Sequence, residues 1–143
     1  MKEITKEMIA QHQLVNRILL DFEKTSKEDT DMMIEIFNLF KDNWTKHMLL
    51  EEAHIFPVTD KSNPIETKEL NLLLKDHKDL KEIIINFEED INSGTKPDTK
   101  VFREMLVSHE QREVQSFYPL LDKRLSANVK QKILNDIKNV KLG

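Results

Sequence analysis

The sequence predicts an all-α protein, a four-helix bundle followed by a short C-terminal helix. Two observations indicate this fold class. The chain has 143 residues with only two glycines and four prolines, and its apolar residues recur at spacings of three and four, which is typical of helices with one buried face. A domain of this length buries roughly 68 to 70% of its unfolded surface. We therefore expect residues 1–143 to form a single domain with one bundle.

Turn-forming residues gather in three breaks, at 25–30, 59–64 and 92–98, and these separate four long segments. Asn63 followed by Pro64 predicts a helix that starts with an N-cap and then proline. Gly94 suits the left-handed residue that ends the preceding helix. A fourth break near Ser126 predicts the short C-terminal helix.

Each of the four segments carries an apolar stripe that is interrupted by one histidine. Two segments add a glutamate one turn after that histidine, on the same face. The stripes are Ile4, Met8, His12, Val15, Leu19 and Phe22; Phe37, Phe40, Trp44, His47 and Glu51; Leu70, Leu73, His77, Leu80, Ile84, Phe87 and Ile91; and Phe102, Leu106, His109, Glu113, Phe117 and Leu120. A buried polar group without partners costs up to a few kcal/mol. Six such groups in a core must therefore satisfy one another.

The chain also contains an internal repeat of two helical hairpins. QHQLVNRILLDFE at 11–23 aligns with DHKDLKEIIINFE at 76–88, and KHMLLEEAHIFP at 46–57 aligns with SHEQREVQSFYP at 108–119. Two hairpins that pack about a pseudo-twofold axis form a four-helix bundle with facing, equivalent sites. The equivalent positions include the six polar residues of the stripes.

Composition excludes several classes of protein. The chain has no cysteine, so any metal must be held by imidazole and carboxylate. It shows no signal peptide and no apolar run of about 20 residues, so we expect a cytoplasmic protein that does not enter a membrane. Its net charge is -4 and its lysines are spread among acidic residues, which argues against nucleic-acid binding. No feature identifies a protein partner.

Histidine and glutamate in this pattern predict a site for two metal ions. H-x-x-x-E places imidazole and carboxylate about 6 Å apart along one helix face, and both are ligands of hard or borderline divalent metals. We expect Glu51 and Glu113 to bridge the ions, with His12 and His47 at one ion and His77 and His109 at the other. Coordination positions would then remain open for a small ligand.

The combined motifs resemble those of hemerythrins and the broader HHE cation-binding domains. The matching residues are His12, the H-x-x-x-E of 47–51 followed by an aromatic residue and Pro57, His77, and the H-x-x-x-E of 109–113 followed by an aromatic residue and Pro119. The resemblance implies an up-down-up-down hemerythrin-like bundle. It also implies two iron ions with a water, hydroxide or oxo bridge, and binding of O2 or a related small molecule such as NO or peroxide.

Two departures separate the chain from the oxygen-carrying hemerythrins. The carriers have a second histidine in helix three, at the position where this chain has Leu73, and an aspartate five residues after the helix-four histidine. Here Glu113 lies four residues after His109, as in HHE domains proposed to handle iron or redox signals. Peroxide or NO turnover by a di-iron enzyme, iron or oxygen sensing, iron handling and a metal-free bundle are the alternatives to binding a gas.

Several further residues have weaker claims on the site. His54, three residues after Glu51, could supply the missing ligand, although a surface position is the simpler interpretation. Asp76, Asp79 and Glu110 adjoin predicted ligands and could orient an imidazole. Tyr118 aligns with Phe56, which favours a packing role over a hydrogen-bonding one. Core positions are likewise predicted for Phe37, Phe40, Trp44, Phe87 and Phe117.

Overall fold

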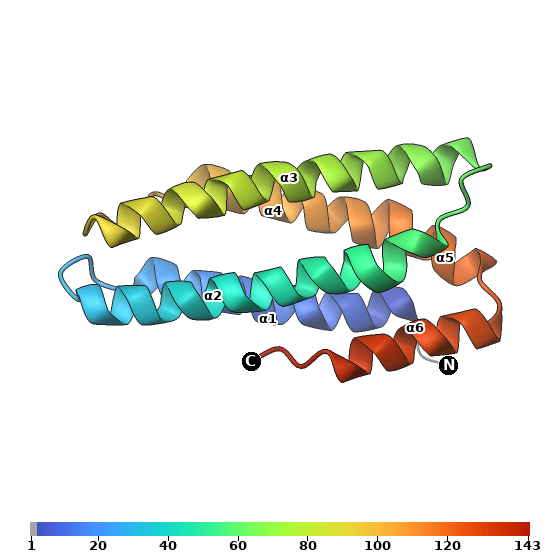
Figure 1. Ribbon diagram of the computed structural model, residues 1–143, viewed down its shortest axis with the longest axis horizontal. Coiled ribbons are helices and arrows are strands. Elements are labelled where there is room, and N and C mark those ends of the chain that lie inside the picture. Colours follow the sequence, from blue (N-terminus) through green and yellow to red (C-terminus); the bar gives the residue numbers. More distant parts are fainter. Residues whose placement is uncertain (1–2) are drawn as a thin grey trace.

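Four long helices run up and down and pack as two hairpins, as a computed structural model that describes residues 3–143 shows (Figure 1). The α1–α2 hairpin lies beside the α3–α4 hairpin, and the last helix, α6, lies below the right-hand part of α1 and α2 in this view. The elements are α1 (Ile4–Lys24), α2 (Thr30–Leu50), η1 (Glu51–Ile55), η2 (Phe56–Val58), α3 (Pro64–Asn92), α4 (Lys100–Arg112), η3 (Glu113–Phe117), α5 (Tyr118–Arg124) and α6 (Ala127–Asn139). The predicted all-α bundle with a short C-terminal helix is confirmed.

The predicted breaks and caps mark the helix ends. The side chain of Asn63 accepts hydrogen bonds from the backbone N–H groups of Ile65 and Glu66, and Pro64 is the first residue of α3. Gly94 follows α3 with a φ of 84°, a conformation that residues with a Cβ rarely adopt. Ser126 caps α6 by accepting from the N–H of Val129.

Two π-helical turns follow the glutamates of the H-x-x-x-E motifs, and the sequence did not predict them. The N–H of Phe56 donates to the carbonyl of Glu51, and the N–H of Tyr118 donates to the carbonyl of Glu113. A proline comes next in both segments. Proline has no N–H and its ring clashes with the carbonyl four residues earlier, so a wider turn before it relieves the conflict.

The second π-turn corrects one predicted core position. The stripe that continues at helical spacing from Glu113 placed Leu120 in the core. In the structure Leu121 is fully buried and Leu120 is partly exposed. The π-turn inserts one extra residue into the helix, so the buried face moves forward by one position.

The apolar core forms two clusters with the histidines between them. One cluster, near the loops that close the hairpins, contains Val15, Leu19, Phe22, Phe37, Phe40, Trp44, Leu80, Phe87 and Leu106. The other contains Ile4, Met8, Leu50, Leu73, Phe117, Tyr118 and Leu121 together with Ile133, Leu134 and Ile137 of α6. In α1 and α3 the histidine separates residues of one cluster from residues of the other, and in α2 the change falls between Met48 and Leu50, just after His47. His109 likewise lies between Leu106 of the first cluster and Phe117 of the second. The polar layer is therefore enclosed at both ends by hydrocarbon.

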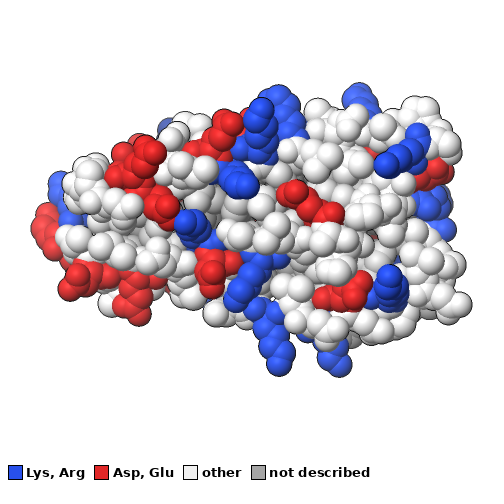
Figure 2. Space-filling model, viewed as in Figure 1, with Lys and Arg blue, Asp and Glu red and all other residues white. Residues whose placement is uncertain are grey.

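The surface carries both signs of charge. On the face in Figure 2, lysine and arginine are interspersed with acidic side chains, which gather at the left-hand end. Among residues 3–143 no helix is long and apolar enough to cross a lipid bilayer.

Candidate metal site

The six residues predicted from the stripes meet in one layer of the bundle. The four histidines are 3 to 5% exposed, and both glutamates are 0% exposed. The α1–α2 hairpin with η1 supplies His12, His47 and Glu51, and the α3–α4 hairpin with η3 supplies the other three residues, His77, His109 and Glu113. The structure thus brings together residues that are up to about a hundred positions apart in the sequence.

Each glutamate lies between a histidine of its own hairpin and a histidine of the other hairpin. Glu113 Oε1 is 3.0 Å from His12 Nε2, and Glu113 Oε2 is 3.3 Å from His109 Nε2. Glu51 Oε1 is 3.2 Å from His47 Nε2 and 3.3 Å from His77 Nε2.

The histidines themselves form two pairs. The rings of His12 and His47 have centroids 4.9 Å apart, and the rings of His77 and His109 are also 4.9 Å apart. Both glutamates therefore connect the His12–His47 pair with the His77–His109 pair.

The donor atoms fit a cation. In two overlapping groups the potential ligand atoms all lie within 4.8 Å of one another: Glu51, His77, His109 and Glu113 in one, and His12, His47 and Glu113 in the other. Among the described residues, Glu51 Oε1 and Glu113 Oε2 are buried without a hydrogen-bond donor. An unsatisfied buried acceptor costs about 1–3 kcal/mol, and more when it is charged. A bound cation would satisfy both oxygens.

Charged neighbours in the layer shift the pKa values of His109 and Glu51. Burial opposes the charged form of His109, but the negative charge of Glu113 and a hydrogen bond to Asp76 outweigh burial, so the pKa of His109 is raised well above its ordinary value. Burial also opposes the charge of Glu51, yet His47 and His77 hold the pKa of that carboxyl well below its usual range. Glu51 is thus available as an anionic ligand.

Three of the histidines have an outer hydrogen-bond partner at Nδ1. His47 Nδ1 is 2.8 Å from Gln11 Oε1, His77 Nδ1 is 2.9 Å from Glu52 Oε2, and His109 Nδ1 is 3.0 Å from Asp76 Oδ2. In the neutral imidazole, the form that binds a metal, an acceptor at Nδ1 keeps the proton there and leaves the Nε2 lone pair directed into the site.

Among the three predicted orienting residues, the structure places one beside a histidine. Asp76 adjoins His77 in the sequence, but its side chain contacts His109 instead. Asp79 instead pairs with Lys75, and Glu110 accepts a hydrogen bond from Asn16. Sequence reasoning missed Gln11 and Glu52, although each of them directly adjoins a predicted ligand.

Tyr118 has a larger part in the site than its alignment with Phe56 indicated. Its hydroxyl is buried and donates a hydrogen bond to Glu51 Oε2. Burial, followed by the negative charges of Glu113 and Glu51, raises the pKa of Tyr118 well above its ordinary value. The phenol therefore stays protonated and acts as a fixed donor to the carboxylate. The sequence offered one signal for this role, because Tyr118 is the one tyrosine of the chain.

His54 and Leu73 lie outside the layer of ligand atoms. The side chain of His54 is 42% exposed, with Nδ1 3.2 Å from Asp136 Oδ2 of α6. Leu73 is fully buried in the apolar cluster that also contains Phe117 and Tyr118. Hydrocarbon therefore occupies the position where the oxygen carriers have their additional histidine.

A buried layer of imidazoles and carboxylates inside a four-helix bundle is the architecture of a cation-binding protein. Residues 3–121 match the family model of the hemerythrin HHE cation binding domain. The chain belongs to this family. Comparisons with curated proteins and with solved structures give no significant match.

Proposed function

We propose that the chain is a non-heme di-iron protein that binds O2 or a related small ligand, NO or peroxide, at a carboxylate-bridged centre. The observation that carries this proposal is the position of each glutamate between one histidine of each pair. Two ions in such a site would share both carboxylates, as in other carboxylate-bridged bundles.

The ligands divide between the two ions by hairpin. His12 and His47 would hold one ion, His77 and His109 would hold the other, and Glu51 and Glu113 would bridge them. Bound iron would supply redox electrons and open coordination positions, which the protein side chains alone lack.

The remaining side chains control the surroundings of the centre. The two apolar clusters limit access of water from both ends of the layer. Tyr118 holds one oxygen of Glu51 and thereby fixes the orientation of that carboxylate. These features suit a centre that is open to a small, uncharged ligand and closed to larger substrates.

The proposal is tested by iron loading of the metal-free protein under anaerobic conditions. We expect about two iron ions per chain by metal analysis, and loss of two-ion loading in Glu51→Ala and Glu113→Ala. His54→Ala is the matched control because it removes an imidazole that faces α6, and it should load as the unaltered protein does. No iron uptake, or full loading of both glutamate variants, would contradict the proposal.

Absorption spectra of the loaded protein then separate binding from turnover. A spectrum that changes on addition of O2 and returns on deoxygenation identifies a reversible binder. Consumption of hydrogen peroxide or NO with release of product identifies an enzyme, a role for which the same ligands would serve.

A further inference from the structure

The two halves of the site have matching ligands but different surroundings. In the repeat, Gln11 is equivalent to Asp76, and Glu52 is equivalent to Val114. The internal symmetry that relates His12 to His77 and His47 to His109 therefore ends immediately outside the ligands.

This difference determines which acceptors the histidines have at Nδ1. His77 and His109 both donate to a carboxylate, of Glu52 and Asp76 respectively. His47 donates to the neutral amide oxygen of Gln11. On the His12 side the position equivalent to Glu52 is Val114, whose side chain has no acceptor.

A carboxylate acceptor makes an imidazole a stronger ligand, because it stabilises the partial positive charge that develops on the ring when Nε2 binds a cation. We propose that the His77–His109 position binds a divalent metal more tightly than the His12–His47 position and fills first. This inference rests on the proposed two-metal function and adds that its two positions are unequal.

Two other groups, Arg112 and Glu110, reduce the difference in metal affinity between the two positions without removing it. Arg112 Nε lies 3.9 Å from Asp76 Oδ2, and Arg112 Nη1 lies 3.8 Å from Glu69 Oε2. These distances exceed the 3.0 Å between Asp76 and His109. Glu110 adds a carboxyl group on the His12 side, where the side chain of Asn16 donates to it at 2.8 Å. The direct contacts to imidazole N–H groups still favour the His77–His109 position.

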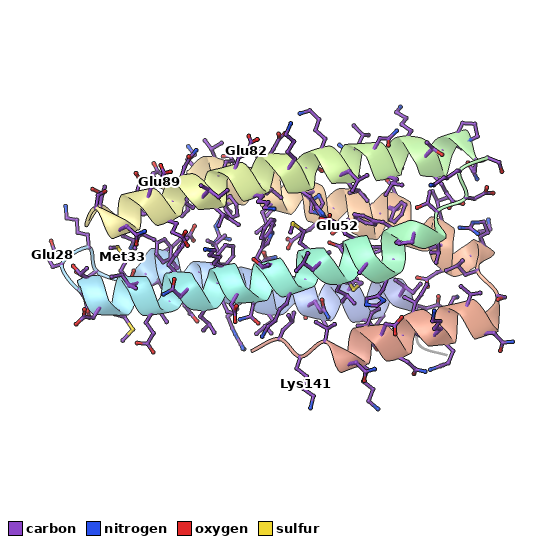
Figure 3. All side chains as sticks on the ribbon, in the orientation of Figure 1. Glu28, Met33, Glu52, Glu82, Glu89 and Lys141 are labelled. Carbon is purple, nitrogen blue, oxygen red and sulfur yellow. The ribbon has the colours of Figure 1, made fainter. Side chains whose placement is uncertain are left out.

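Glu52 and Asp76 can be altered without opening the core. Their side chains are 38% and 31% exposed, and Figure 3 shows Glu52 where the end of α2 approaches α3. Glu52→Gln and Asp76→Asn keep the size and an acceptor oxygen while removing the charge. Gln11→Glu makes the reverse change on the other side.

The experiment is a titration of the metal-free protein with Co2+, followed by calorimetry and visible absorption. We expect two unequal binding steps. Asp76→Asn and Glu52→Gln should each weaken the tighter step by about 10- to 100-fold, which is the usual effect of losing such a partner, and Gln11→Glu should strengthen the weaker step. Asp79→Asn is the matched control. Asp79 lies on α3, as Asp76 does, but its carboxylate pairs with Lys75.

The outcomes distinguish this inference from the proposed function. Two equal steps, or a loss confined to the weaker step in Asp76→Asn and Glu52→Gln, would overturn the inequality and leave the two-metal site in place. Absence of any second binding step in the unaltered protein would overturn both.

Discussion

At the scale of single residues, one hydroxyl group distinguishes the two aromatic side chains beside the site. The Phe56 ring has its centroid 5.2 Å from that of His77, and the Tyr118 ring lies 6.4 Å from His12. Tyr118 adds a donor to the buried oxygen of Glu51. Because Glu51 is 0% exposed, bulk water cannot replace that donor.

Tyr118→Phe should therefore destabilise the metal-free protein while preserving the fold, since phenylalanine occupies the equivalent position 56. Loss of the donor leaves a buried carboxylate oxygen unsatisfied, at a cost of about 1–3 kcal/mol. Urea unfolding of the metal-free protein measures this difference. An unchanged free energy of unfolding would show that the hydroxyl does not support Glu51.

The six ligand candidates could be predicted individually because each polar residue interrupts an apolar stripe, a pattern that one helix displays by itself. The outer partners could not be predicted in this way. Gln11 and Asp76 contact histidines of a different helix, so their contacts depend on how the helices pack. Two residues that adjoin in a helix point about 100° apart, and sequence proximity to a ligand therefore says little about contact with it.

At the scale of helices, the start of α1 is capped by a residue from the far end of the chain. Asp122 Oδ1 accepts from the N–H of Ile4 at 2.8 Å, and Oδ2 accepts from the N–H and the hydroxyl of Thr5 at 3.0 and 2.6 Å. Glu3, the residue before the helix, makes no capping bond with its side chain. Helix α1 is thus fixed to α5 at its first turn.

Asp122→Ala should cost about 1–2 kcal/mol of stability at neutral pH, as loss of an N-cap does. Burial raises the pKa of Asp122, but the hydrogen bonds from Thr5 and Ile4 outweigh it and hold that pKa below its ordinary value. The stabilisation is therefore present above the ordinary pKa of about 4 and is lost as pH falls through the lower folded value.

Thermal or urea unfolding of Asp122→Ala and of the unaltered protein, from pH 7 down to pH 2, measures how the stabilisation by Asp122 depends on pH. Asp42→Ala is the control, because the side chain of Asp42 is 71% exposed and its loss should change stability by less than about 0.5 kcal/mol. A stability difference that grows on acidification would contradict the assignment of Asp122 as a cap.

Helix ends could be predicted closely because the cap residues act locally, as Asn63, Gly94 and Ser126 do. The π-turns could not, because an apolar period of three and four does not reveal one inserted residue. The buried Leu121 in place of Leu120 is the consequence of that insertion.

At the scale of the whole molecule, α6 extends the structure past residue 121, where the family match ends. Ile133, Leu134 and Ile137 of α6 join the apolar cluster of Ile4 and Met8. Lys130 donates to Glu3 and to the carbonyl of Asp122, at 3.0 and 2.6 Å. We propose that α6 belongs to the same domain as the bundle, so that residues 1–143 form one domain.

Ile133→Ala should then lower the free energy of unfolding of the whole protein by about 2 kcal/mol or more, the usual cost of truncating a buried isoleucine. Ile133 is 3% exposed. Val129→Ala, on the same helix at 41% exposure, is the matched control and should change stability little. Equal unfolding curves for Ile133→Ala and the unaltered protein would show that α6 folds separately from the bundle.

The two π-turns also determine where the chain tolerates a change in length. Deletion of one residue between Glu51 and Phe56, or between Glu113 and Tyr118, would restore ordinary α-helical spacing, and the same face of the following segment would stay buried. The ring of Pro57 or Pro119 would then clash with the carbonyl four residues earlier, a conflict that the wider turn relieves. An added or removed residue in the loop at 25–29 changes no such register. Insertions and deletions should therefore be accepted at the closed ends of the hairpins and rejected beside the two glutamates.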